Sequence, residues 1–194
     1  MDSDLDLRVR EDGRVAVVRP RGTLTSDTAP LLRRSLVKGL LGLGRVVVDL
    51  DVFRLGRASC VRVFPAVLDH CGGWPKARLT LWQPDQEMAE ALHAHQVPAL
   101  VPVHDDFLDS LAAFEHRPPT MRVRTRLACD HRAPAIARQL VRECCPTWQV
   151  SRARQGVVEL VATELVANAV THARTASTFT VERQARGLRV AVCD

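Results

Sequence analysis

Arg45-Val46-Val47-Val48-Asp49-Leu50 is a continuous apolar run in the first half of the chain. A run of this length without polar alternation is typical of a strand that is buried on both faces of a sheet. The segment before it, 28–41, carries an apolar stripe at helical spacing and is followed by glycines that end a helix. After it, the turn Leu55-Gly56-Arg57 leads into a second helical pattern over 58–71. The run therefore predicts a central strand between two helices.

Strands and helices alternate through the first 116 residues. We predict strands over 5–10, 14–19, 77–82 and 99–103, and further helices over 85–95 and 105–114. This order predicts an α/β (α+β) fold with a mixed sheet and helices packed on it. The segment His116-Arg117-Pro118-Pro119-Thr120 is stiffened by proline and marks a boundary. We therefore expect one domain over 1–116, a linker over 117–120 and a second domain over 121–194.

The second half contains the stretch Glu164-Leu165-Val166-Ala167-Asn168-Ala169-Val170-Thr171-His172-Ala173. It ends a helical segment, 152–173, that is apolar on nearly every side, and such a helix is expected to be buried. Glu164, Asn168 and His172 are four residues apart, so they share one helical face. Burying an amide without a partner costs about 2–7 kcal/mol, and burying a carboxylate costs more. We expect a partner for this polar line, either from the protein's own polar groups or from a ligand.

The elements around this helix complete a second pattern. Alternation predicts a strand over 121–127, and a helix over 133–145 follows it. Two closing strands are predicted over 178–183 and 188–193, with a turn between them. The strand over 188–193 would lie at a sheet edge and invite association, so a homodimer is one expectation.

Composition excludes several classes of function. The 194 residues carry a net charge of +5, and the basic residues are spread along the chain, which argues against direct nucleic-acid binding. No apolar run is long enough for a membrane span, and the acidic start does not resemble a signal peptide, so we expect a cytoplasmic protein. The six cysteines form no C-x-x-C pair and are expected to be reduced and buried.

The first 115 residues resemble a STAS domain, the fold of anti-sigma-factor antagonists, in element order and in the strand at 46–50 that leads through a turn into a helix. In that family a serine in this turn is phosphorylated by a partner kinase. The corresponding stretch here is Arg57-Ala58-Ser59-Cys60. Ser59 has two interpretations: it is a helix-capping hydroxyl, or it is a phosphorylation site at which the phosphate pairs with Arg57.

From Met121 onward the chain resembles the anti-sigma-factor serine kinases of the GHKL ATPase group. The match rests on 164–173, which resembles the N box of that group, and on the strand that leads to Asp194. The resemblance implies that ATP and Mg²⁺ are bound. Asn168 would contribute a ligand to Mg²⁺, Glu164 would be the general base, and Asp194 would contact adenine. His172 would support the phosphates or cap the end of the helix.

The lid and the glycine-rich box of the kinase group have no counterpart before the chain ends at Asp194. We therefore expect a fragment, or a reading frame that ended early, with weak or absent ATP binding and no kinase activity of its own.

The combined hypothesis is a partner-switching regulator of sigma-factor activity, with a sigma factor or a STAS-domain antagonist as partner. One alternative is a non-catalytic protein-interaction module. Another is a sensor histidine kinase or other GHKL ATPase. Against it, no dimerisation helix with a phospho-accepting histidine precedes the helix that resembles the N box.

Overall fold

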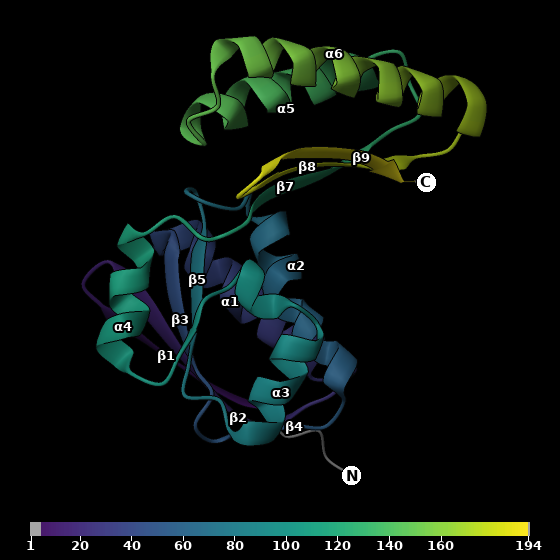
Figure 1. Ribbon diagram of the computed structural model, residues 1–194. Coiled ribbons are helices and arrows are strands. Elements are labelled where there is room, and N and C mark those ends of the chain that lie inside the picture. The colour runs from purple at the N-terminus through teal and green to yellow at the C-terminus, as the bar shows by residue number, and fades with distance from the viewer. Residues whose placement is uncertain (1–4, 194) are drawn as a thin grey trace. The chain divides into compact units, whose positions relative to one another are not determined.

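The computed structural model describes residues 5–193 and divides into two compact units, Met1–Pro119 (unit 1) and Thr120–Asp194 (unit 2) (Figure 1). Each unit has its own sheet and its own helices. Among the described residues, no helix is long and apolar enough to cross a membrane.

Unit 1 alternates strands and helices, as the apolar run at 45–50 predicts. Its strands are β1 (Asp6–Asp12), β2 (Val15–Leu24), β3 (Arg45–Asp49), β4 (Phe53–Leu55), β5 (Arg78–Trp82) and β6 (Val103–His104). Its α-helices are α1 (Ala29–Leu43), α2 (Val63–His70), α3 (Gln86–Ala94) and α4 (Phe107–Ala112), with short 3₁₀ turns at η1 (Ala58–Arg62), η2 (Val97–Ala99) and η3 (Ala113–Glu115).

The sheet of unit 1 is mixed, with strand order β1-β2-β3-β5-β6. Strands β1 and β2 form an antiparallel hairpin, whereas β2, β3, β5 and β6 run parallel, and β4 pairs with the far end of β2. The β3 strand lies in the middle, and its residues 46–48 are fully buried. The predicted α/β fold with a mixed sheet is confirmed.

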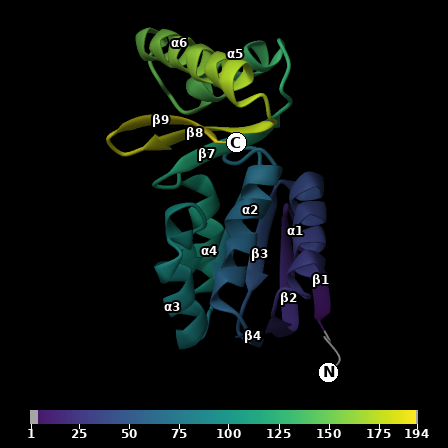
Figure 2. The ribbon, with the colours of Figure 1, turned by 90° about the vertical axis from the view of Figure 1, so that its right-hand side faces the viewer.

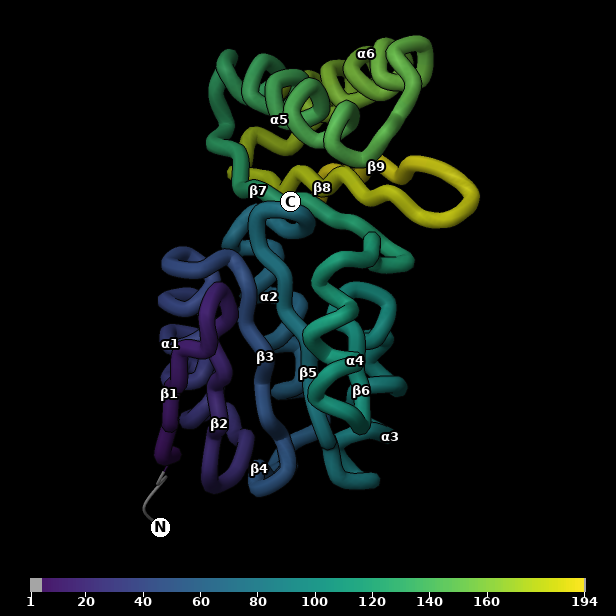
Figure 3. Tube along the Cα trace, turned by 90° about the vertical axis from the view of Figure 1, so that its left-hand side faces the viewer, coloured from purple at the N-terminus to yellow at the C-terminus, as the bar shows by residue number. Residues whose placement is uncertain are grey.

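Helices cover both faces of this sheet (Figures 2 and 3). The main core lies between the sheet and helices α1, α2 and α3, and it includes Leu36, Val48, Phe64 and Leu92. A smaller core on the other face joins Val47 to Phe114 and to the half-buried residues around α4. Because β3 is covered on both faces, residues 46–48 are a continuous apolar run without polar alternation.

Unit 2 has a three-stranded antiparallel sheet under two helices. Its elements are β7 (Met121–Leu127), α5 (Ala133–Thr147), α6 (Arg152–Asn168), a π-helical turn η4 (Ala169–Ala173), β8 (Ser177–Gln184) and β9 (Gly187–Cys193). The strand order is β7-β8-β9. Helix α5 packs on β7, and α6 packs on α5 and β9. Phe179 and Val181 of the central strand are fully buried beneath the helices.

Three local predictions were wrong. The apolar segment 99–103 forms a 3₁₀ turn and only the two-residue strand β6, because prolines at 98 and 102 interrupt it. Helix α6 is not buried all round: Val158, Ala162 and Val166 are buried, but several of its other apolar residues are exposed. Cysteines 144 and 145 are buried as expected, whereas Cys129 and Cys193 are exposed.

Candidate functional site

A tight crossing of backbone sets the position of the Ser59 turn. The amides of Gly56 and Arg57 both donate to the carbonyl oxygen of Leu24, at 3.0 and 3.2 Å, just after β4 pairs with β2. A Cβ atom at position 56 would lie 2.7 Å from Cγ2 of Thr23 and 3.1 Å from the oxygen of Leu24. Glycine is therefore required at this point for the chain to pass so close to β2.

Ser59 lies on the surface immediately after this crossing, within the η1 turn. The residue at the N-cap position of η1 is Arg57, with an extended backbone, and the cap is made without a side-chain hydrogen bond. The prediction that Ser59 is a capping hydroxyl was therefore wrong. The Ser59 side chain is exposed, so its hydroxyl is accessible to a modifying enzyme.

Two guanidinium groups flank the Ser59 hydroxyl along the chain. Arg57 donates to the hydroxyl of Ser26 at 3.4 Å, and Arg62 lies 3.4 Å from Nδ1 of His95. Both arginines are exposed, and within the described residues neither forms an ion pair. By contrast, the nearby Arg54 is paired with Asp85 at 2.7 Å. The surroundings of Ser59 are therefore net positive, which favours an added phosphate.

The polar line of α6 is the second candidate site. Ser151 caps the helix by accepting from the amide of Arg154 at 3.4 Å. Glu159 and Thr163 face α5, because Glu159 pairs with Arg142 at 2.9 Å and Thr163 lies 3.5 Å from Arg138. Glu164 and Asn168 lie on the side of the helix away from these two residues.

Glu164, Asn168 and His172 are all exposed, and His172 lies in the π-helical turn at the end of the helix. No hydrogen bond or ion pair joins any of the three side chains to another described residue. The three side chains are therefore exposed to water, and folding carries no free-energy cost for burying them. Asp194, the expected contact to adenine, lies outside the described residues.

The fit of this face to ATP and Mg²⁺ is partial. Glu164 and Asn168 provide oxygen donors of the type that Mg²⁺ prefers. Between residues 5 and 193, however, no group of three His, Cys, Asp or Glu side chains could hold a metal ion. The three side chains form one exposed wall of unit 2.

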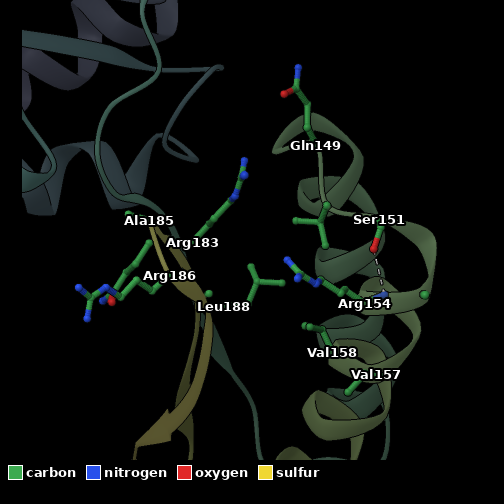
Figure 4. A pocket seen from close by; sticks show the side chains of 13 residues that line it. Gln149, Ser151, Arg154, Val157, Val158, Arg183, Ala185, Arg186 and Leu188 are labelled. Carbon is green, nitrogen blue, oxygen red and sulfur yellow. Dashed lines mark hydrogen bonds between the residues drawn. The ribbon is translucent and has the colours of Figure 1, made fainter.

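One hollow of unit 2 lies at the other end of α6 (Figure 4). It has a volume of about 990 Å³ and lies between the first turns of α6 and the turn that joins β8 to β9. Arg154, Arg183 and Arg186 contribute to its lining, together with Val157 and Leu188. Arg183 also donates to the carbonyl oxygen of Trp148. Sequence alone did not show this hollow, because its two sides are about thirty residues apart in the chain.

A smaller hollow of about 450 Å³ lies on the α4 side of unit 1, against the β1–β2 hairpin. Arg8, Arg10 and Arg19 line it, with Trp82 and Phe107 as an aromatic wall. The two rings are 5.1 Å apart. Arg19 is engaged by Asp49 and Asp51, so part of the positive charge of this hollow is already neutralised.

Solved structures of similar fold match about 60% of this chain. An anti-sigma factor antagonist from Mycobacterium paratuberculosis matches with a TM-score of 0.52 at 18% identity, over 60% of this chain and 98% of that protein. The antagonist SpoIIAA in its unphosphorylated form matches with a TM-score of 0.45 at 10% identity, over 57% of this chain and 96% of that protein. The first match shows a shared fold, and its share of this chain is close to that of unit 1. No protein-family model and no curated protein sequence matches the chain.

Proposed function

We propose that this protein is a partner-switching regulator, in which unit 1 binds an anti-sigma factor and thereby releases a sigma factor. The fold that unit 1 shares with an anti-sigma factor antagonist carries the proposal. The exposed turn at Ser59 supplies a place for the switch, since it follows the Gly56 crossing and its hydroxyl is free to react.

Phosphorylation of Ser59 is the proposed switch. A phosphate adds a charge of about −1.5 to −2 and three strong acceptor oxygens. Arg57 and Arg62 are the nearest candidates to bind it along the chain. The modification would thus cancel most of the positive charge on this surface, and a partner that binds the unmodified turn would lose affinity.

For unit 2 we propose a kinase-like module that retains one wall of a nucleotide site. Two helices on an antiparallel sheet, with Glu164 and Asn168 on the free side of α6, support this role. Mg²⁺, when bound, would neutralise phosphate charge. Asn168 would offer it an oxygen ligand, and Glu164 would hold a carboxylate near an incoming hydroxyl. Because the fit is partial, we propose that the chain alone has no kinase activity.

The proposal is tested by incubating the full chain with an anti-sigma-factor serine kinase and ATP, followed by mass spectrometry. We expect one phosphate, on Ser59, and none on the Ser59→Ala variant. The Ser26→Ala variant is the matched control, because Ser26 is also exposed and lies beside Arg57; it should be labelled as the parent is. An unlabelled Ser59 under conditions that phosphorylate a known antagonist would overturn the phosphorylation switch.

A second candidate function is a protein-interaction module without a phosphorylation switch. The exposed apolar residues of α6 favour it, since an uncovered apolar surface marks a contact site. This candidate predicts that the anti-sigma factor binds equally well to the chain before and after treatment with the kinase.

A further inference from the structure

The smaller hollow of unit 1, which we call the hairpin hollow, lies between strand β1 and helix α4. Strand β1 contributes Arg8, Arg10 and Asp12 to its lining, and α4 contributes Phe107. Helix α4 packs on β5 and β6, so this face of the β1–β2 hairpin lies beside the helix rather than beneath it (Figure 3). The volume of about 450 Å³ falls in the range of sites that bind small molecules.

Strand register places the two ends of the hairpin hollow on one face of the sheet. Arg10 pairs with Val17, and the parallel partner of Val17 is Val47. Two residues further along β3, and so on the same face, Asp49 pairs with Trp82. Three strand spacings separate β1 from β5. The backbones of Arg10 and Trp82 are therefore about 14 Å apart, at about 4.8 Å for each spacing.

The end of the hairpin hollow at β5 is an aromatic wall that is held in place. The rings of Trp82 and Phe107 lie 5.1 Å apart and are tilted by 57°. Nε1 of Trp82 donates to the carbonyl oxygen of Asp105 at 3.1 Å, so the polar group of the indole is already satisfied. Both rings are only half-buried. Their exposed surface suits the aromatic ring of a ligand, because such rings attract one another in offset or edge-to-face contact.

Strand β2 contributes a guanidinium group that still has unused donors. Nε of Arg19 lies 3.0 Å from the carboxylate of Asp49, and Nη2 donates to Asp51 at 2.9 Å, so the group is fixed in position. Nη1 of Arg19 carries further N–H donors and makes no hydrogen bond to a described residue. A donor group that is already fixed loses little conformational entropy when it binds an anion.

Arg10 supplies the unpaired positive charge of the hairpin hollow. Its side chain is exposed and, in the part of the chain that the structure describes, forms no ion pair or hydrogen bond. Arg8, by contrast, pairs with Asp6 at 3.5 Å. Three arginines and two aspartates line the hollow, so the lining carries a net charge of +1. A ligand with one negative charge therefore matches this lining better than a di- or triphosphate does.

We propose that the hairpin hollow binds a small aromatic carboxylate. The ring of the ligand packs against Trp82 and Phe107. Its carboxylate accepts hydrogen bonds from Arg10 and from Nη1 of Arg19, and such charge-assisted bonds are the strong ones. Because the two ends of the hollow are far apart, the ligand is elongated, with a spacer between its ring and its carboxylate.

This site goes beyond the proposed function and does not depend on it. It uses neither Ser59 nor any residue of unit 2. A chain in which Ser59 is never phosphorylated would still bind the ligand.

Proton–nitrogen NMR of the full chain tests the site, with cinnamate as the probe. The Nε1–H signal of Trp82, identified by its loss in Trp82→Phe, reports on the aromatic wall. We expect this signal to shift and to saturate with a dissociation constant of about 1 mM or lower. Cinnamamide, which lacks the charge, and hexanoate, which lacks the ring, should each bind at least about tenfold more weakly. Phenyl phosphate, which carries more charge, should also bind more weakly than cinnamate.

Variants separate the two ends of the hairpin hollow. Arg10→Gln should weaken cinnamate binding about tenfold, because it removes the unpaired charge. Arg14→Gln is the matched control: Arg14 is exposed in the turn between β1 and β2, outside the lining, and its loss changes the net charge equally. It should change the affinity less than about twofold. Phe107→Leu keeps an apolar side chain but removes the ring, and it should weaken binding about threefold or more.

Circular dichroism of each variant establishes that it is folded. A Trp82 signal that does not shift at about 10 mM cinnamate would overturn the proposal. So would cinnamamide or phenyl phosphate that binds as tightly as cinnamate, or equal effects of Arg10→Gln and Arg14→Gln.

Discussion

The carboxylate of Asp49 lies 3.0 Å from Nε of Arg19, with only 4% of the Asp49 side chain exposed. The contact joins the end of the central strand β3 to β2. Nε of Arg19 is itself buried and makes no aligned hydrogen bond to a described residue, so the interaction is an ion pair held by charge. The same guanidinium reaches Asp51 at 2.9 Å, but the Asp51 side chain is 41% exposed.

The two carboxylates should differ in their contribution to stability. Asp49→Asn removes a charge from a buried contact, and we expect it to lower the free energy of unfolding by about 1–3 kcal/mol. Asp51→Asn removes an exposed pair, which is worth less than about 1 kcal/mol. Urea unfolding of both variants compares them directly. Equal effects would show that burial of Asp49 does not set the strength of its ion pair.

Gly56 provides a second test, at the turn that positions Ser59. Gly56→Ala should destabilise unit 1 by about 1–3 kcal/mol, because the new methyl group would press against Thr23 and the carbonyl of Leu24. Gly42→Ala is the control, since a Cβ there meets nothing within 4 Å and alanine favours a helix by up to about 1 kcal/mol. The midpoint of thermal unfolding should therefore fall for Gly56→Ala and rise for Gly42→Ala. A neutral Gly56→Ala would contradict the close crossing.

The fold could be predicted from the sequence where the pattern of side chains is local. The run at 45–50 and the strand at 121–127 were both placed correctly, since their period depends only on neighbouring residues. Strand β4 was missed, because its three residues are held by pairing with β2, about thirty positions earlier. The helical segment predicted over 152–173 was found, but α6 ends at Asn168 and the last five residues form the π-helical turn η4, which no sequence period shows.

The packing of α5 against α6 should depend on pH through Glu159. Its pKa is lowered because the carboxylate accepts hydrogen bonds from Gln155 and from Arg142. A folded pKa below the unfolded value, about 4.3, means that the stabilisation is fully present above that pH and is lost as the pH falls through the folded pKa. The loss should be below about 1 kcal/mol. The Glu159→Gln variant should not show this loss of stability in acid unfolding. The Glu143→Gln variant leaves the Arg142 pair in place and should still show it.

ATP binding is expected to be very weak. Glu164 and Asn168 form one exposed wall, and neither side chain is held by a hydrogen bond or ion pair to another described residue. Titration with a fluorescent ATP analogue should therefore show no saturable binding below about 1 mM, which corresponds to less than about 4 kcal/mol of binding free energy. Micromolar binding that requires Mg²⁺ and is lost in Asn168→Ala would contradict this expectation.

The candidate sites were only partly visible in the sequence. The spacing of Glu164, Asn168 and His172 places them on one side of α6, as helical geometry requires. Their exposure was not predicted, because an apolar helix looks the same in sequence whether its own chain or another molecule covers it. The capping role of Ser59 was wrong for a similar reason: the backbone of Arg57 occupies the cap position, and a sequence pattern cannot tell the two residues apart.

The central claim is that the surface around Ser59 binds an anti-sigma factor and that phosphate on Ser59 disrupts this binding. Isothermal titration calorimetry of the full chain with the anti-sigma-factor kinases of the same genome measures the affinity of this binding. We predict that the unmodified chain binds one of them, that Ser59→Asp weakens this binding at least about tenfold, and that Ser26→Asp changes it less than about threefold. If none of these kinases binds the unmodified chain, or if Ser59→Asp binds as tightly as the parent, the account is contradicted.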